Sequence, residues 1–177
     1  MKGGGQAGEE VTATVFQELK ERESRKCNII IHNLKEPDKK IKESEERIEK
    51  DKNSFDELCK VIEADVDMSS LRFAKRLGAV HEDGSARPLL VGFQTTEQCQ
   101  NVLDKTPGLS ELEERWSQIH VVRDLTKLQR KEEKDLRDDL VKRNGELQGA
   151  DAENWIWKVV GRRGERKLVK VAREKEG

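Results

Sequence analysis

The feature that most constrains the fold of this chain is one short apolar segment, Cys27–Leu34, which contains three consecutive isoleucines at positions 29, 30 and 31. β-Branched side chains fit a pleated strand better than a helix. A charged stretch precedes the segment, and Pro37, which interrupts regular structure, follows it. A short apolar strand with no amphipathic flanks predicts a central strand of a sheet.

Composition predicts a small core and an uneven distribution of charge. Charged residues make up 40% of the 177 positions, hydrophobic residues 33% and aromatic residues 4%. The apolar residues are clustered, which favours folded regions over disorder. The net charge of −1 argues against a non-specific polyanion binder. Between residues 155 and 173, however, there are seven basic residues and one acid, Glu165. Such asymmetry is a hint of nucleic-acid contact at that end of the chain.

The patterns after the first strand predict helices alternating with three further strands. Ser54 and Glu57 form a capping-box pattern, which marks the start of a helix. Leu71, Phe73 and Leu77 recur at period two, which predicts a strand with these side chains on one face. The expected elements are helices over 54–64 and from Thr95 to a break at Pro107–Gly108, a short helix or connector over 109–116, and strands over 71–77, 87–93 and 118–122.

The order strand, helix, strand, strand, helix, strand defines an expected α+β fold. It is the order of a ferredoxin-like βαββαβ sandwich, in which a four-stranded sheet carries two helices on one face. We assign this domain to residues 26–124. The highly charged segment 39–52 is interpreted as a solvated helix or an insertion within it.

The regions on either side of this domain have patterns of their own. Residues 1–8 are rich in glycine and predict disorder. Residues 9–25 have apolar positions spaced four apart, which predicts an amphipathic helix that either packs on the domain or ends a coiled coil. Residues 125–177 predict a small C-terminal module, with a helix capped at Asp124–Thr126 that ends near Asn144–Gly145, and then a basic β-hairpin.

No pattern of catalytic or metal-ligating residues is present in the sequence. The cysteines are far apart and predict reduced core thiols in an intracellular protein, and the histidines lack metal-ligand spacing. We therefore expect no enzyme, no cofactor, no metal and no small-molecule substrate, and the lack of a long apolar run predicts no membrane partner. The residues concerned are Cys27, Cys59, Cys99, His32, His81 and His120.

A sandwich with this order of elements is also the architecture of the RNA-recognition motif. The first strand of that family reads aliphatic, aromatic, aliphatic, any residue, Asn, Leu, and Ile29–Leu34 matches every position except the second, which is Ile30. Val91–Phe93 fits the end of the family's third-strand motif, but Pro88 and Leu90 occupy its two aromatic positions. The platform on which this family stacks bases is therefore missing.

The segments Glu23–Leu34, Lys75–Gly78, Arg87–Phe93 and Arg123–Arg130, in this order, resemble the first-open-reading-frame proteins of LINE-type (non-LTR) retrotransposons. In that family a trimeric coiled coil precedes a divergent RNA-recognition motif and a small C-terminal domain. The resemblance implies a single-stranded RNA- or DNA-binding protein with nucleic-acid chaperone-like activity, in a cytoplasmic ribonucleoprotein that could also enter the nucleus. It also implies a homotrimer, of whose coiled coil only the end is expected here.

The resemblance further implies a basic rather than aromatic binding surface, between the recognition motif and the C-terminal domain. Phosphate neutralisation by Lys and Arg releases counterions and makes such binding sensitive to salt. Arg123 is expected at the exit of a central strand, and Trp155 and Trp157 on one strand face, in the core or, second, as base-stacking groups. The candidate residues are Arg25, Lys26, Arg72, Lys75, Arg76, Arg87, Arg123, Lys127, Arg130, Arg162, Arg163, Arg166 and Lys167.

A different class of function is compatible with the same sequence. A recognition-motif sheet without aromatic residues could pack on a protein partner, and the N-terminal helix could join a coiled coil. This alternative is a protein-interaction or oligomerisation module that binds no nucleic acid. The near-neutral net charge favours it, whereas the segregation of charge favours nucleic-acid binding.

Overall fold

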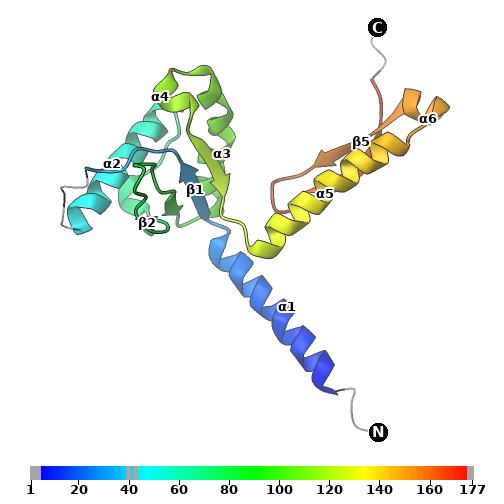
Figure 1. The fold of residues 1–177 in the computed structure, drawn as a ribbon, viewed down its shortest axis with the longest axis horizontal. Helices are drawn as coiled ribbons and strands as arrows, with labels where there is room; N and C mark the ends of the chain where they lie inside the picture. Colours follow the sequence, from blue (N-terminus) through cyan, green and yellow to red (C-terminus); the bar gives the residue numbers. More distant parts are fainter. Residues whose placement is uncertain (1–4, 39–40, 42–43, 175–177) are drawn as a thin grey trace. The chain divides into compact units, whose positions relative to one another are not determined.

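The computed structural model describes residues 5–38, 41 and 44–174, and the side chains from residue 12 onward. The chain forms two compact units (Figure 1). Unit 1 is made from the ranges Met1–Arg22 and Leu125–Gly177, and unit 2 is Glu23–Asp124. The secondary structure is mixed, with a four-stranded antiparallel sheet in unit 2 and a two-stranded hairpin in unit 1.

The sheet of unit 2 contains β1 (Asn28–His32), β2 (Phe73–Arg76), β3 (Leu89–Gly92) and β4 (His120–Arg123). The strands lie in the order β2-β3-β1-β4, and every neighbouring pair is antiparallel. β1 is therefore a central strand, as the isoleucine run predicted. β4, which was expected to be central, lies at an edge, because among the described strands it pairs only with β1.

The core of unit 2 lies between one face of the sheet and its two longer helices, α2 (Ser44–Val61) and α3 (Thr96–Lys105). Ile29 and Ile31 pair with Val91 and Leu89 across β1 and β3, and all four side chains are fully buried. Phe55 of α2 is also fully buried, and its ring contacts Phe93 edge to face, with centroids 6.1 Å apart. Burial of these residues is the main favourable contribution to the fold of unit 2.

Helix α2 begins at Ser44, ten residues before the predicted start at Ser54. The capping-box pattern of Ser54 and Glu57 therefore lies inside the helix and does not mark its start. Glu45 and Glu46 occupy the first turn, where negative charge interacts favourably with the helix dipole. The segment 39–52 was interpreted as a solvated helix or an insertion, and its residues from 44 onward are helical. The positions 39, 40, 42 and 43 lie outside the described residues.

Strand β2 differs from its prediction in the direction of its side chains. Leu71 precedes the strand and is buried, but Ala74 rather than Phe73 is the residue of β2 that enters the core. The period-two argument fails because Leu71 is the residue that caps the end of a short 3₁₀ helix, Met68–Ser70, and lies outside the pleated strand. Phe73 consequently lies on the sheet face opposite the helices.

Capping interactions fix the start of two helices where the sequence predicted them. Thr95 caps α3 and Thr126 caps α5 (Lys127–Glu146), each in a reciprocal capping box with the glutamine three residues later. Between α3 and β4 the chain forms a 3₁₀ helix, Thr106–Glu111, and a short helix α4 (Glu114–Ser117). Pro107 lies in the first turn of the 3₁₀ segment, just after α3 ends, in agreement with the predicted break.

Unit 1 contains α5, the short helix α6 (Gly149–Asn154), which was not predicted, and the hairpin of β5 (Trp155–Val160) and β6 (Lys167–Ala172), which was. Helix α1 (Gly5–Arg25) includes residues 5–8, which were expected to be disordered, because this stretch also contains good helix formers and leads into a helical segment. Residues 1–4 lie outside the described part of the chain.

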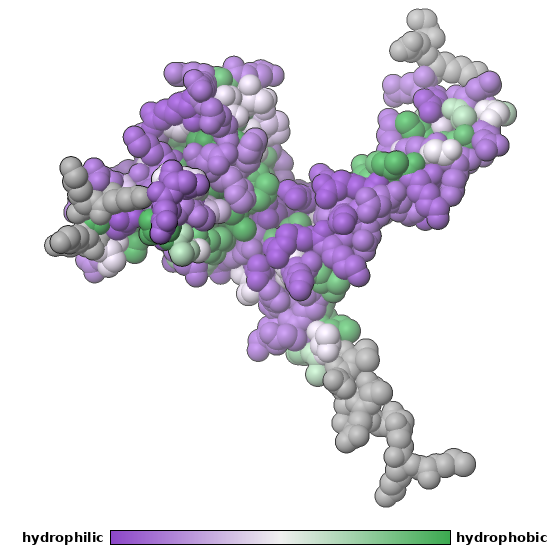
Figure 2. Space-filling view, in the orientation of Figure 1, coloured by the Kyte–Doolittle hydropathy of each residue, from purple (hydrophilic) through white to green (hydrophobic). Residues whose placement is uncertain are grey.

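The surface is largely polar, as the composition requires (Figure 2). Among the described helices, none has a stretch that is long and apolar enough to cross a membrane. All three cysteines are buried within unit 2, in agreement with the predicted core thiols. Burial raises the pKa of Cys59 to about 12 and that of Cys99 to about 11, so both remain protonated at neutral pH.

The burial of Phe55 leads to a first prediction. We expect Phe55→Ala to lower the free energy of unfolding of unit 2 by about 3 to 5 kcal/mol, because it removes a fully buried ring and leaves a cavity. Val61→Ala, on the same helix but 37% exposed, should cost less than about 1 kcal/mol. Urea denaturation followed by circular dichroism measures both. Equal losses in the two variants would contradict the proposed core.

Candidate functional site

Three exposed predicted cations of unit 1 lie at the turn between β5 and β6. Arg162 and Arg163 are in the turn and Lys167 begins β6, and all three are exposed. Within the described part of the chain, their side chains have no hydrogen bond or ion pair. In the same described region, the one acid of the turn, Glu165, forms no ion pair with them, so the positive charge of this turn is open to solvent.

The conformation of this turn is fixed by a buried carboxylate on α5. Glu133, whose side chain is 7% exposed, accepts a hydrogen bond from the backbone N–H of Gly164 at 2.7 Å and pairs with Arg166 at 3.3 Å. Gly164 has φ +94°, and a Cβ there would lie 2.9 Å from Cδ2 of Leu125. Only glycine fits this position without strain. Glu133 and Gly164 thus hold the turn in a defined shape, and Arg166 serves partly as a structural partner.

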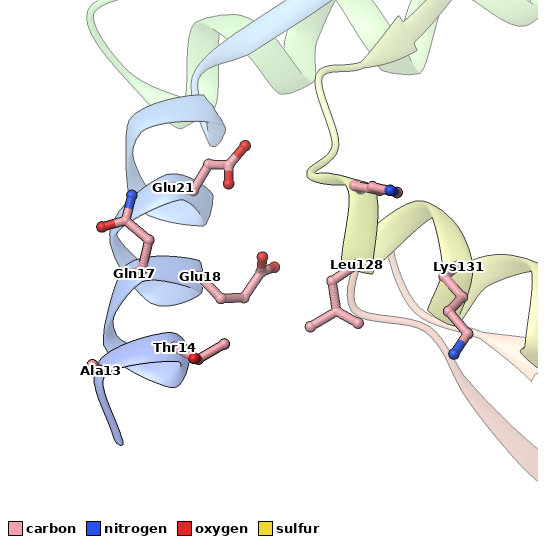
Figure 3. A pocket seen from close by; sticks show the side chains of 8 residues that line it. Ala13, Thr14, Gln17, Glu18, Glu21, Leu128 and Lys131 are labelled. Atoms are coloured by element: carbon pink, nitrogen blue, oxygen red, sulfur yellow. The ribbon is translucent and has the colours of Figure 1, made fainter. Parts of the chain in front are cut away.

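Two further predicted cations lie at the start of α5. Lys127 is exposed, whereas Arg130 donates a hydrogen bond to the carbonyl of Leu125 at 2.6 Å. Lys127, together with Leu128 and Lys131, forms one wall of a groove of about 810 Å³ whose other wall is α1 (Figure 3). The α1 wall includes Glu18 and Glu21, so the groove has a mixed rather than a basic rim.

The face of the sheet in unit 2 that lies opposite the helices carries another part of the predicted set. The register places Phe73, Gly92 and Asn28 in one row across β2, β3 and β1 on this open face. The next row contains Lys75, Leu90 and Ile30, followed by Val122 on β4. Lys75 is exposed, and its ammonium lies 5.4 Å from the centre of the Phe73 ring. An aromatic residue is therefore present on this face, from a strand where the motif comparison did not expect one.

A chain of hydrogen bonds anchors one end of the open face. Arg72 donates to Oδ1 of Asn28 at 2.6 Å, and Nδ2 of Asn28 donates to Asp124 at 3.1 Å. The other carboxylate oxygen of Asp124 accepts a hydrogen bond from Arg25 at 2.9 Å. Asn28 and Asp124 are both buried. Arg25 and Arg72 are thus held at fixed positions, and Arg25 has an internal counter-ion, which reduces its value for an external phosphate.

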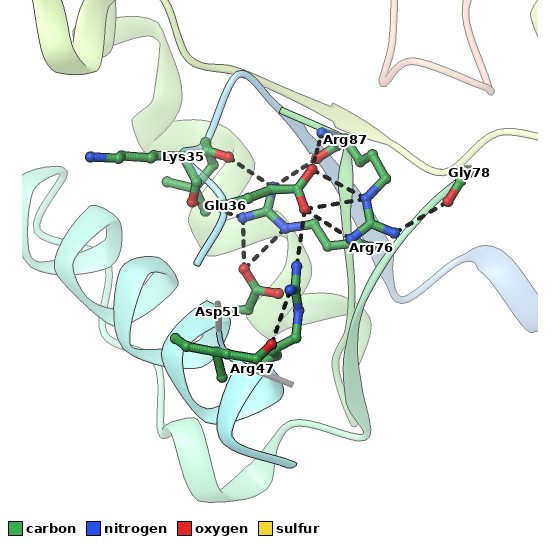
Figure 4. Close-up of polar contacts among 9 residues, drawn as sticks. Lys35, Glu36, Arg47, Asp51, Arg76, Gly78 and Arg87 are labelled. Atoms are coloured by element: carbon green, nitrogen blue, oxygen red, sulfur yellow. Dashed lines mark hydrogen bonds and ion pairs between the residues drawn. The ribbon is translucent and has the colours of Figure 1, made fainter. Parts of the chain in front are cut away.

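Arg76 and Arg87 belong to an internal network at the opposite end of the same strands (Figure 4). The Arg76 side chain is 4% exposed and donates to Asp51 at 2.7 Å and to the carbonyl of Leu34 at 2.7 Å. Arg87 pairs with Glu36 at 2.8 Å. Since these guanidinium groups are engaged inside unit 2, neither arginine is available to bind an external phosphate. The sequence alone could not show that these two arginines differ from exposed ones, because their acidic partners are 25 and 51 residues away.

The last two predicted cations, Arg123 and Lys26, also have partners within unit 2. Arg123 is paired with Ile29 in the register, which places it on the helix-covered face, where it donates to Gln100 of α3. Lys26 is exposed and pairs with Glu23 at 2.5 Å. A solvent-exposed ion pair of this kind contributes little to stability, so Lys26 remains available to bind an external anion. Arg123 does not point to the open face.

The tryptophans of the hairpin occupy the same face, as expected for alternate residues of a strand. Trp155 is 40% exposed, with the ammonium of Lys170 5.6 Å from its ring centre. The guanidinium of Arg143 lies 4.6 Å from the centre of the half-buried Trp157 ring. Trp157 therefore packs against α5, while Trp155 retains an exposed aromatic surface.

The histidines do not form a metal site in the described residues, where no group of three or more His, Cys, Asp or Glu side chains is placed to hold a metal ion. His32 and His120 are cross-strand neighbours on β1 and β4. Burial lowers the pKa of His32, and the nearby His120 lowers it further, so His32 is neutral at pH 7.

A scan against models of known protein families finds no match for this chain, and a search of curated proteins finds no similar sequence. Function therefore has to be inferred from the side chains and their geometry. Two surfaces are candidate binding sites. One is the group of turn cations (Arg162, Arg163 and Lys167) in unit 1, and the other is the open sheet face with Phe73 and Lys75 in unit 2.

The ion pair of Glu36 and Arg87 leads to a prediction about pH. Hydrogen bonds from Arg87 lower the pKa of Glu36 from 4.5 to about 2. Because the folded state binds this proton more weakly than the unfolded state, the pair stabilises unit 2 fully above about pH 4.5, and the contribution is lost as the pH falls to 2. The contribution is on the order of 2 to 3 kcal/mol.

We expect Glu36→Gln to be less stable than the wild-type chain at pH 7, with a difference that shrinks between pH 4.5 and pH 2. Urea denaturation of both proteins across this range measures the difference. Glu82→Gln, in the exposed connection between β2 and β3, is the control and should show no such trend. A difference between wild type and Glu36→Gln that does not vary with pH would rule out this origin of acid sensitivity.

Proposed function

We propose that the chain binds single-stranded RNA or DNA without catalysing a reaction, and that its main contact is between phosphates and the turn cations of unit 1. The observation that carries this proposal is that Arg162, Arg163 and Lys167 are exposed without internal partners, on a turn whose shape Glu133 and Gly164 fix. Most other predicted cations have a partner inside the protein. A fixed, unneutralised cluster gains more from an external polyanion than cations that already have counter-ions.

The near-neutral net charge of −1 restricts where such binding can occur. A chain with balanced charge does not attract polyanions over its whole surface, so binding depends on local clusters. Arg offers both a planar fork for phosphate and a flat face for a base. Phosphate contacts carry no sequence information, and we therefore expect little sequence preference and rapid exchange between strands, which is the basis of chaperone-like annealing.

We also propose that unit 2 is a ferredoxin-like sandwich of the RNA-recognition-motif type. The strand order β2-β3-β1-β4, with α2 after β1 and α3 after β3, supports this assignment. The resemblance of the sequence to LINE-type first-open-reading-frame proteins supports the same function. It extends the proposal to a retrotransposon-like ribonucleoprotein in the cytoplasm and to self-association through α1.

A second candidate function, a protein-interaction module, is favoured by a separate observation. Val15, Phe16 and Leu19 of α1 are 54%, 72% and 58% exposed. Neighbouring exposed apolar side chains of this size mark a surface that a protein partner could cover. This function does not require the turn cations, so the two candidates can be separated experimentally.

The proposal predicts that Arg162→Glu combined with Arg163→Glu weakens binding to a labelled single-stranded RNA of roughly 30 nucleotides by about tenfold or more at low salt. The salt slope should also become shallower by about two, one for each lost phosphate contact. Fluorescence anisotropy at several salt concentrations measures both quantities.

The matched control is Lys134→Glu combined with Arg137→Glu, which changes the charge equally at exposed positions of α5. The control should retain most of the affinity. Equal loss in both double variants would mean that net charge alone governs binding. Unchanged binding in the turn variant would contradict the proposed interface and would favour the protein-interaction function.

A further inference from the structure

We infer that Phe73 of β2 is a stacking site for one unpaired base, which gives the chain a preference for single strands over duplexes. This inference rests on the proposed nucleic-acid binding and adds a contact on unit 2 to it. It differs from the motif-based expectation, because the aromatic side chain comes from edge strand β2 and the positions on β1 and β3 are Ile30 and Leu90.

The position of the Phe73 ring depends on Gly92. These residues are cross-strand partners, and the distal end of the ring lies over the Gly92 backbone. A Cβ at residue 92 would be 2.6 Å from Cζ of Phe73, closer than real Cβ contacts come, so any larger residue would displace the ring. The ring is half-buried and stays on the open face of the sheet, where the helices of unit 2 do not cover it.

Two cations lie over the Phe73 ring, and their charges favour an anionic ligand. The guanidinium of Arg72 lies 5.5 Å from the ring centre and is held by Asn28, and the ammonium of Lys75 lies 5.4 Å from it on a flexible, exposed side chain. A base on the ring brings its own phosphates within reach of both groups. Stacking on an aromatic ring requires a base that is not paired within a duplex, so the contact selects single strands.

The surroundings of the ring also indicate what the site does not read. The neighbouring row of the open face consists of Lys75, Leu90, Ile30 and Val122, which offer no side-chain group to distinguish base edges apart from one ammonium. The amide of Asn28 is already hydrogen-bonded to Arg72 and Asp124. We therefore expect the site to accept any of the four bases.

The test is Phe73→Leu, which keeps an apolar side chain over Gly92 but removes the ring. With single-stranded RNA carrying 2-aminopurine, the wild-type protein should quench the fluorescence of the stacked base, and the variant should not. The variant should also bind the single strand at least about fivefold more weakly, with an unchanged salt slope and unchanged duplex affinity. The matched control is Leu112→Ala, which removes a 39% exposed apolar side chain elsewhere in unit 2 and should leave all these quantities unchanged.

Cross-linking of the wild-type protein provides a second measurement that does not depend on the folding of a variant. Ultraviolet cross-linking to RNA containing 4-thiouridine, with mass spectrometry of the products, should place adducts on the peptide containing β2. Unchanged affinity and quenching in Phe73→Leu, or adducts that exclude this peptide, would overturn the stacking site while leaving the phosphate contacts of unit 1 in place. If the wild-type chain bound no single-stranded RNA even at low salt, the proposed function itself would fail.

Discussion

The structure of unit 2 depends on the burial of one face of a single central strand. Ile29 and Ile31 contact neighbouring strands on both sides and the helices above them, so the few apolar residues of this chain are concentrated where each makes many contacts. Removing apolar surface from water is the dominant favourable term in folding. A chain with 40% charged residues can therefore still form a stable sheet with one covered face and one open face.

Unit 1 is held together in a different way. Among its described residues only Leu125, Thr126 and Glu133 are buried, and two of these are polar. Thr126 caps α5, and Glu133 binds the turn of the hairpin, so specific hydrogen bonds define positions that a larger core would otherwise define. This arrangement leaves the turn cations exposed on a turn of defined shape, which is the basis of the proposed phosphate contact.

Local patterns in the sequence predicted the elements whose cause is local. The isoleucine run identified a central strand, and the threonine caps at 95 and 126 marked the starts of α3 and α5, because these signals act within a few residues. The start of α2 and the direction of Phe73 were wrong. In both cases a plausible local pattern, a capping box or a period of two, was overridden by the surrounding chain.

The candidate site was only partly predictable for the same reason. Sequence identified the basic hairpin, but it could not show that Asp51 and Glu36 engage Arg76 and Arg87, since ion-pair partners distant in sequence meet only in the folded chain. It also could not place Phe73 over Gly92, because this contact depends on the register of β2 with β3. The exposed cations that lack a partner can be identified only once the internal ion pairs are known.

The measurement that tests the central claim most directly is the salt dependence of binding by the unmodified chain. A labelled single-stranded RNA of roughly 30 nucleotides would be titrated at several salt concentrations, with anisotropy as the readout. The account predicts measurable binding at low salt and a linear fall of log affinity with log salt, with a slope of about −2 or steeper for a cluster of three or more cations. Binding that does not depend on salt, or no binding at low salt, would contradict it.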